Sequence, residues 1–261
     1  MELKKKKIMA AIAAVFWCVL LSITPVFAAG DDYRIEQLYI NMPDVTAYYR
    51  SSQGDSDLEA YLGGEKLSLK DVENFEKTGE AVEYYILVDI SSSLPQERFA
   101  DIKAALTQFH SELRENDSMV LITFGNEVKQ ILNGTEDQDT AAAAISALNN
   151  DNGNTVLFDA INTAADMIWK EGASSEKRRI ITVISDGKDC ADDTRSAEST
   201  ESTLKSRGIP IYTMAMENIE GDSEVETQNY RGKFAAMARD TGGVPWTVSG
   251  GQNTLDGLHT I

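Results

Sequence analysis

The chain has 261 residues, 42% of them hydrophobic and 25% charged, which fits one globular domain of ordinary size with an additional segment. Its 42 acidic and 24 basic residues give a formal net charge of −18. We therefore do not expect nucleic acids or anionic membrane surfaces as partners, because both would repel so acidic a chain.

Residues 1–28 predict a secretory signal peptide. Lys4 to Lys7 form a basic start, an apolar run from Ile8 to Ile23 follows, and Val26-Phe27-Ala28 suits cleavage after Ala28. The alternative is an uncleaved N-terminal anchor, although the apolar run is short for a membrane span. Cleavage would remove four lysines and one glutamate, so the net charge would fall by three to about −21. We expect an exported protein, secreted or held at a bacterial cell surface.

The mature chain would keep one cysteine, Cys190, so no disulfide can form within it. We expect this cysteine to be a bystander; a covalent dimer is the alternative. Residues 29–80 predict a small β-rich extension, with short strands at 33–42 and 45–50 and a turn at 62–65.

Residues 81–261 alternate between apolar strands and amphipathic helices. The predicted strands are 84–89, 119–124, 179–185, 209–216 and, more weakly, 244–248, and an antiparallel edge strand at 127–132 follows the turn residues Gly125-Asn126. The predicted helices cover 99–113, 139–148, 157–168 and 231–238. This order predicts an α/β fold: a doubly wound, mainly parallel sheet with helices on both faces.

Five oxygen-bearing side chains follow strand ends or open a helix. Asp89, Ser91 and Ser93 come at alternate positions where one apolar strand ends, Thr155 opens a helical stretch, and Asp186 ends a second apolar strand. Ligands bind beyond the carboxyl ends of the strands in such sheets. Carboxylate and hydroxyl oxygens suit Mg²⁺ or Mn²⁺, so these residues predict a metal site.

Each part of this pattern also has a purely structural interpretation. Ser91 and Ser93 could cap a helix before Pro95, and Asp186-Gly187 could be a plain turn. We expect Asp159 to make a structural hydrogen bond. Three further acids follow Asp186 and could rim the cleft, but we expect them to be solvated in a loop: Asp189, Asp192 and Asp193. The loops 189–194 and 217–228 are expected to set ligand specificity.

Asp89-x-Ser91-x-Ser93, Thr155 and Asp186-Gly187 resemble the metal-ion-dependent adhesion site of the von Willebrand factor type A domain. The resemblance covers roughly residues 84–261. It implies that Ser91 and Ser93 are direct ligands of Mg²⁺ or Mn²⁺ and that Thr155 binds directly or through water. Asp89 and Asp186 would hold coordinated waters and orient the serines. An acidic side chain of a protein partner would complete the coordination.

The resemblance thus implies an exported adhesion or protein-binding module. One alternative is a scaffolding subunit of a larger surface protein with a structural metal, anchored to a membrane or cell wall through a C-terminal part missing from this chain. Another is an aspartyl nucleophile at Asp89, but phosphoryl-transfer enzymes of that kind normally have a second acid where this chain has Ser91. His110 and His259 are poorly placed as bases and no Gly-x-Ser-x-Gly elbow or glycine-rich phosphate loop is present, so we expect no enzymatic activity.

Overall fold

The computed structural model describes residues 3–9, 33–41, 44–51, 59–62, 64–150, 153–172, 177–190, 195–216, 224–249 and 251–261. The chain divides into two compact units, with the boundary between Glu80 and Ala81. Within the described part of the chain, no helix is both long enough and apolar enough to cross a bilayer.

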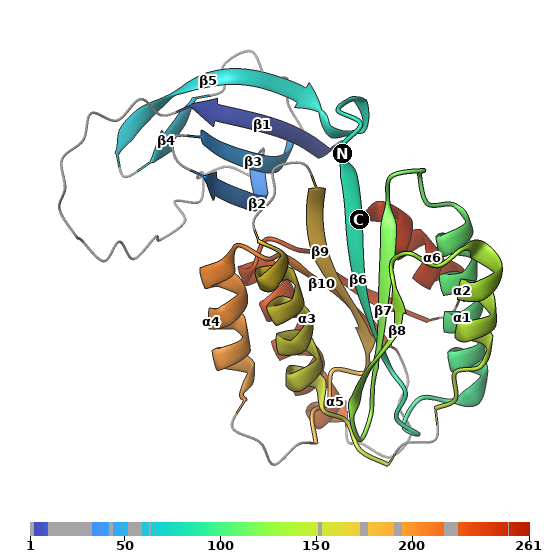
Figure 1. The fold of residues 1–261 in the computed structure, drawn as a ribbon. Coiled ribbons are helices and arrows are strands. Elements are labelled where there is room, and N and C mark those ends of the chain that lie inside the picture. Colours follow the sequence, from blue (N-terminus) through green and yellow to red (C-terminus); the bar gives the residue numbers. More distant parts are fainter. Residues whose placement is uncertain are drawn as a thin grey trace. The chain divides into compact units, whose positions relative to one another are not determined.

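The first unit is a five-stranded antiparallel sheet (Figure 1). Its strands are β1 Leu3–Met9, β2 Tyr33–Asn41, β3 Asp44–Ser51, β4 Ala60–Leu62 and β5 Glu65–Asn74, and the short helix η1 Phe75–Lys77 follows. The spatial order is β2-β3-β1-β5-β4. The expected β-rich extension is present, but the central strand comes from the basic start of the predicted signal peptide, where we expected no strand. The removal of residues 1–28 stays a prediction.

The second unit is the expected doubly wound sheet. Its strands are β6 Ala81–Asp89, β7 Ser118–Phe124, β8 Val128–Asn133, β9 Lys177–Ser185, β10 Ile211–Met216 and β11 Pro245–Val248. They lie in the order β11-β10-β9-β6-β7-β8, all parallel except β8, which pairs antiparallel with β7 as predicted for an edge strand. The two strands that end at Asp89 and Ser185 are therefore neighbours in the middle of the sheet.

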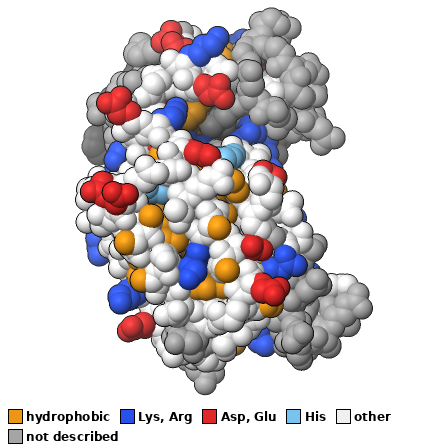
Figure 2. All heavy atoms as spheres, turned by 90° about the vertical axis from the view of Figure 1, so that its right-hand side faces the viewer, with side chains coloured by type: hydrophobic (Ala, Val, Ile, Leu, Met, Phe, Trp, Pro, Cys, Tyr) orange, Lys and Arg blue, Asp and Glu red, His pale blue; other side chains and the backbone are white. Residues whose placement is uncertain are grey.

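In the described part of the chain, six α-helices are present, and they cover the two faces of this sheet (Figure 1). They are α1 Gln96–Ser111, α2 Gln138–Ser146, α3 Leu157–Glu171, α4 Ala197–Arg207, α5 Glu224–Asp240 and α6 Gly251–Thr260. Alternate residues of β6 point to opposite faces, so Ile86 and Val88 pack with α1, α2 and α6, whereas Tyr85 and Leu87 pack with α3, α4 and α5. On the outer side of α1, α2 and α6, acidic, basic and apolar side chains are interspersed (Figure 2).

Helix α4 was not predicted from the periodicity of the sequence. Helix α4 is mostly polar and buries only Thr200 and Leu204, so it lacks the apolar stripe that marks the other helices. Its ends are nevertheless well specified. Ser196 and Ser199 form a capping box at the start, and Gly208 ends it in the left-handed conformation.

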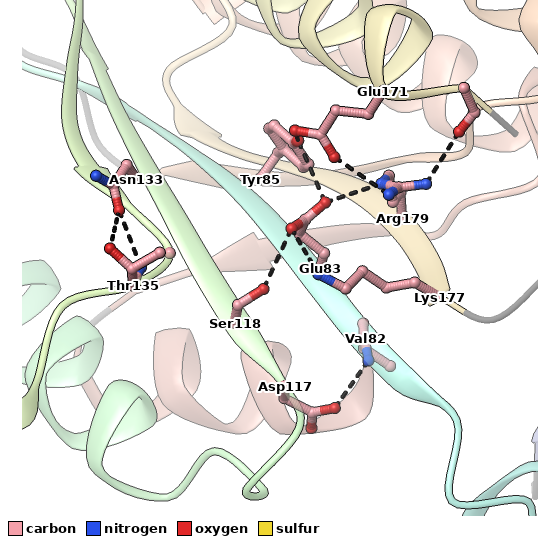
Figure 3. A network of polar contacts seen from close by, with 12 residues as sticks. Val82, Glu83, Tyr85, Asp117, Ser118, Asn133, Thr135, Glu171, Lys177 and Arg179 are labelled. Atoms are coloured by element: carbon pink, nitrogen blue, oxygen red, sulfur yellow. Dashed lines mark hydrogen bonds and ion pairs between the residues drawn. The ribbon is translucent and has the colours of Figure 1, made fainter. Parts of the chain in front are cut away.

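The amino ends of the central strands carry a network of charged side chains (Figure 3). Glu83 of β6 is buried and accepts hydrogen bonds from Arg179 Nε (2.8 Å) and Lys177 Nζ (3.1 Å), both on β9. Arg179 also pairs with Glu171 at 3.1 Å. Burial raises the pKa of Glu83, but Lys177 and Arg179 more than offset this, so the pKa lies below its usual value. The buried negative charge of Glu83 is therefore neutralised by Lys177 and Arg179 at the same end of the sheet.

A candidate metal site at the carboxyl ends of the strands

The five residues singled out in the sequence lie at the carboxyl edge of the second sheet. Asp89 is the last residue of β6, and Asp186 directly follows β9, the strand beside it. Ser91 and Ser93 lie in the loop from β6 to α1, and Thr155 lies just before α3. Four of the five are buried: Asp89, Ser91, Thr155 and Asp186 are each at most 4% exposed. Ser93 is partly exposed.

Asp89 is held by hydrogen bonds on both carboxylate oxygens. Oδ1 accepts from the Ser91 backbone N–H at 2.8 Å, which turns the chain sharply after β6. Oδ2 accepts from Ser185 Oγ at 2.7 Å, and Ser185 Oγ in turn accepts from the Gly187 N–H at 3.0 Å. The carboxylate therefore fixes the loop that carries the two serines and ties it to the neighbouring strand end.

A chain of side-chain hydrogen bonds joins the serines to Asp186. The hydroxyls of Ser91 and Ser93 are 2.8 Å apart, and Ser93 Oγ donates to Asp186 Oδ2 at 2.9 Å. The other Asp186 oxygen, Oδ1, accepts from the Lys188 N–H at 2.8 Å. These contacts bring four predicted residues, from two loops about ninety positions apart in the chain, into one cluster of oxygen atoms.

Within the described residues, no hydrogen bond links Thr155 to these four side chains, and its position is fixed through the backbone. Its carbonyl accepts from the Cys190 N–H at 2.9 Å, which places the loop before α3 beside the loop that follows Asp186. Asp189 Oδ1 accepts from the Leu157 N–H at 2.8 Å and so satisfies the first turn of α3. The Thr155 hydroxyl makes no hydrogen bond to another described residue, so it remains available to a ligand.

The electrostatics of this edge differ from those of an ordinary buried acid. Burial, and then the charge of Asp186, raise the pKa of Asp89 to about 6, in spite of the hydrogen bonds from Ser91 and Ser185. Among the described ion pairs, none reaches Asp89 or Asp186. Two carboxylates are thus held close together, and within the described part of the chain no ion pair neutralises either of them.

The donor set fits a small hard cation. Within the described residues, no group of three or more His, Cys, Asp and Glu side chains could hold a metal ion, so any ion at this edge would need the hydroxyl oxygens as well as the two carboxylates. Oxygen-only donors of mixed charge favour Mg²⁺ or Mn²⁺ over Zn²⁺ and copper.

The structural alternatives are decided differently for the loop that carries Ser91 and Ser93 and for the loop that carries Asp186. Helix α1 has Pro95 at its N-cap and no side-chain cap, so Ser91 and Ser93 are not helix caps. Asp186 does make a turn, through Lys188, but its second oxygen also binds Ser93.

The neighbouring acids have different surroundings. Asp159 was expected to make a structural hydrogen bond, and it forms an ion pair with Arg195, with Asp159 Oδ1 3.3 Å from Arg195 Nε. The expectation that Asp189 is a solvated loop acid is wrong, because it caps α3. Asp192 and Asp193 lie outside the described residues. The loop expected at 217–228 is shorter than predicted, since α5 begins at Glu224.

Three supporting residues were not predicted as part of the site. Ser185 orients Asp89, and Asp189 links the Asp186 loop to α3. Asn150 is 2% exposed and its Nδ2 donates to the Leu94 carbonyl at 2.7 Å, which holds the loop just after Ser93. Ser185 precedes Asp186 at the end of a strand, and this position could have identified it in the sequence as part of the site. Asn150 has no comparable signal in the sequence.

Solved structures with the same fold come from several organisms. An aerotolerance-related membrane protein from Bacteroides fragilis is 20% identical, with a TM-score of 0.52 over 69% of this chain and 96% of that one. BatB from Bacteroides thetaiotaomicron is 21% identical, with a TM-score of 0.53 and the same coverage. A von Willebrand factor type A structure from Catenulispora acidiphila is 14% identical, with a TM-score of 0.55 over 74% and 43% of the two chains. At these identities the likeness shows the fold.

A search of curated proteins found no match. The sequence model of the von Willebrand factor type A domain matches residues 84–241, which is more than half of the chain and includes all five residues of the candidate site. This range spans the second unit from β6 to the end of α5. The chain therefore belongs to the von Willebrand factor type A domain family.

Proposed function

We propose that this protein is an exported adhesion or protein-binding module that uses one divalent cation at the carboxyl edge of its sheet. The observation that carries the proposal is the pair of buried carboxylates, Asp89 and Asp186, joined through the hydroxyls of Ser91 and Ser93 and lacking a described protein cation. A bound cation would favour the charged form of Asp89, whose pKa is raised first by burial and then by the charge of Asp186.

In this proposal Ser91, Ser93 and Thr155 supply neutral oxygens, and Asp89 and Asp186 orient them and hold water. The ion, Mg²⁺ or Mn²⁺, supplies an electrophilic centre. Because three of the five donors are uncharged, the ion would still attract a carboxylate from outside. We infer that the partner is a protein with an exposed acidic side chain. The negative charge of the chain opposes such a partner only at long range, since physiological salt screens charges beyond ~8 Å.

The metal should be tested first, without a partner. Calorimetric titration of the chelator-treated, exported protein with Mg²⁺ and Mn²⁺ should show a single site. Ser93→Ala and Asp186→Asn should each weaken binding at least tenfold, the scale of losing a residue that holds or orients a metal ligand. Ser92→Ala is the matched control, because Ser92 is an exposed neighbour with no described role in the cluster. Equal binding by all four proteins would contradict the metal site.

The partner can then be sought in surface and matrix extracts. Capture by the metal-loaded protein should be lost on chelation or in Ser91→Ala, and should persist in Ser92→Ala. A partner retained in all of these conditions would mean that the metal site is not the recognition surface. If instead the site variants unfold when the metal is lost, a scaffolding subunit with a structural metal is the better description.

Catalysis is the remaining alternative, and we propose that it is absent. Both oxygens of Asp89 already accept hydrogen bonds from Ser91 and Ser185, which suits an orienting group better than a nucleophile. His259 pairs with Glu112 at 2.6 Å on α1. Metal-dependent hydrolysis of a generic phosphoester that is lost in Asp89→Asn would overturn this view. We also propose a location outside the cytoplasm, which rests on the predicted signal peptide.

A further inference from the structure

The sheet of the first unit depends on a strand that the mature protein is expected to lose. β1, residues Leu3–Met9, lies between β3 and β5 and pairs antiparallel with both. Among the described strands, β3 and β5 do not pair with each other. Cleavage after Ala28 would therefore split the sheet into two hairpins, β2-β3 and β4-β5, with a gap one strand wide between them.

Neither hairpin is expected to be stable alone. An isolated two-stranded hairpin is marginal in water, and β4 contributes only three residue pairs to the second one. The small apolar cluster of this unit takes residues from both hairpins: Val45, Ala47 and Leu38 from one, and Leu67, Leu69 and Ala60 from the other. With the gap open, the facing edges of β3 and β5 would expose unpaired N–H and C=O groups, which readily accept another strand.

The register shows what such a strand should carry. Directly opposed residues share a face of the sheet. The position of Lys6 is opposite Ala47 and Val72, and the position of Ile8 is opposite Val45 and Leu69. These are apolar surroundings on one face, so apolar residues suit both positions.

The intervening positions differ between the two neighbouring strands. On the β5 side the positions of Lys5 and Lys7 are opposite Glu73 and Asp71, which are exposed. On the β3 side they are opposite Tyr48 and Thr46, which are buried. A basic side chain with a long aliphatic stem suits such positions, because opposite charges across a strand pair stabilise it modestly and the stem can cover apolar surface. The leader sequence thus has basic residues at positions 5 and 7 and an apolar residue at position 8, but a lysine at the apolar position 6. A segment with an apolar residue there would fit better.

We propose that the first unit of the mature protein is a strand acceptor. The gap between β3 and β5 takes an extended segment of a partner polypeptide, antiparallel to both strands, with apolar residues at the positions of Lys6 and Ile8 and basic residues at those of Lys5 and Lys7. Backbone pairing supplies affinity and the alternate side chains supply selectivity. This binding does not involve the metal site of the second unit.

The test uses the exported protein and three labelled peptides. Mass spectrometry first defines the N-terminus of the exported chain. Fluorescence anisotropy then measures binding of the sequence Leu3–Met9, its Lys6→Val form and its Lys6→Pro form. The valine peptide should bind about tenfold more tightly than the leader peptide, the effect of burying one further apolar side chain. The proline peptide should not bind, because proline in a central strand removes a ladder hydrogen bond.

A change on the acceptor side checks that the peptides enter this gap. Val72→Glu should reverse the preference, so that the leader peptide binds better than the valine peptide. Hydrogen exchange should show β3 and β5 amides becoming protected when peptide is added. Four results would overturn the proposal: a retained leader, equal binding of all three peptides, no binding of any, or β3 and β5 amides already protected in a dimer of the exported chain. Chelator should change none of these measurements, so a failure here is distinct from a failure of the metal site.

Discussion

The buried carboxylates at the two ends of the central strands have neighbours of opposite charge. At the amino end, Glu83 is neutralised by Arg179 and Lys177, and its pKa is lowered (Figure 3). At the carboxyl end, Asp89 lies near Asp186 without a described cationic partner, and its pKa is raised to about 6. The buried charge of the first arrangement is paired within the protein, whereas that of the second would be paired only by a cation from outside.

The largest effect is expected when Glu83, the buried carboxylate at the amino end, loses its main cationic partner. Arg179→Met removes the main partner of Glu83 and should cost about 3 kcal/mol of unfolding free energy, because it leaves a buried charge poorly paired. Urea denaturation measures this loss. The double variant with Glu83→Gln should recover a large part of it. Metal affinity at the other end should be unchanged, and a parallel loss of metal binding would show that the two ends are coupled.

The second experiment removes the negative charge of Asp89 at the carboxyl end. Asp89 has an ordinary pKa of 3.8 and a folded pKa of about 6, so its folded form binds the proton more tightly. Its contribution to stability is therefore fully present below pH 4 and is lost as pH rises through 6, at a cost of up to about 3 kcal/mol. In metal-free protein, Asp89→Asn should raise stability by about 2 kcal/mol at pH 7.5 and by almost nothing below pH 4. Thermal unfolding with chelator across this pH range measures the effect.

Bound metal should reverse the order of stability of the wild type and Asp89→Asn at pH 7.5. Saturating Mg²⁺ should stabilise the wild type and leave Asp89→Asn unchanged, because binding to the folded state alone adds to its stability. If Asp89→Asn is destabilising at pH 7.5 without metal, the carboxyl end is not the electrostatically unfavourable one, and the comparison fails.

A smaller effect is expected at the turn after Asp186. Gly187 has φ +85°, and an added Cβ would lie 3.3 Å from Phe234 Cβ and 3.4 Å from the Tyr230 carbonyl. Gly187→Ala should cost about 1–2 kcal/mol and weaken metal binding, because the strain falls on the loop that carries Asp186. Gly153→Ala is the control, since its φ is ordinary and an added Cβ would meet nothing within 4 Å. Equal loss of metal affinity in both variants would contradict a specific role for this turn.

The smallest effect concerns the link between the Asp186 loop and α3. Asp189→Ala removes the acceptor of the Leu157 N–H and should cost about 1 kcal/mol, the usual value of a helix cap. It should also weaken metal binding, since Asp189 holds the loop next to Thr155. Asp137→Ala removes a comparable cap from α2 and should leave metal affinity unchanged. Comparing the two by calorimetry separates capping from support of the site.

The sequence alone determined the sheet, four of the six described helices that cover it, and the choice of the five candidate residues. Apolar runs and helical periodicity are local properties, and the carboxyl ends of parallel strands meet at one edge whatever the details of packing. That is why Asp89 and Asp186 could be expected together. Helix α4 was not predicted, because it contributes little apolar surface to the core and is specified by the residues that cap its ends.

Only the tertiary structure decided how these residues are supported. That Ser185 binds Asp89 and Asn150 binds Leu94 depends on contacts between segments 56 or more positions apart, which no local pattern encodes. That Glu83 meets cations and Asp89 meets another acid is likewise a property of the strand register. The same holds for the basic start of the chain, which has the composition of a leader but pairs between β3 and β5. Strand pairing depends on which backbone edges are left open, and the sequence of one strand does not reveal the edges of the others.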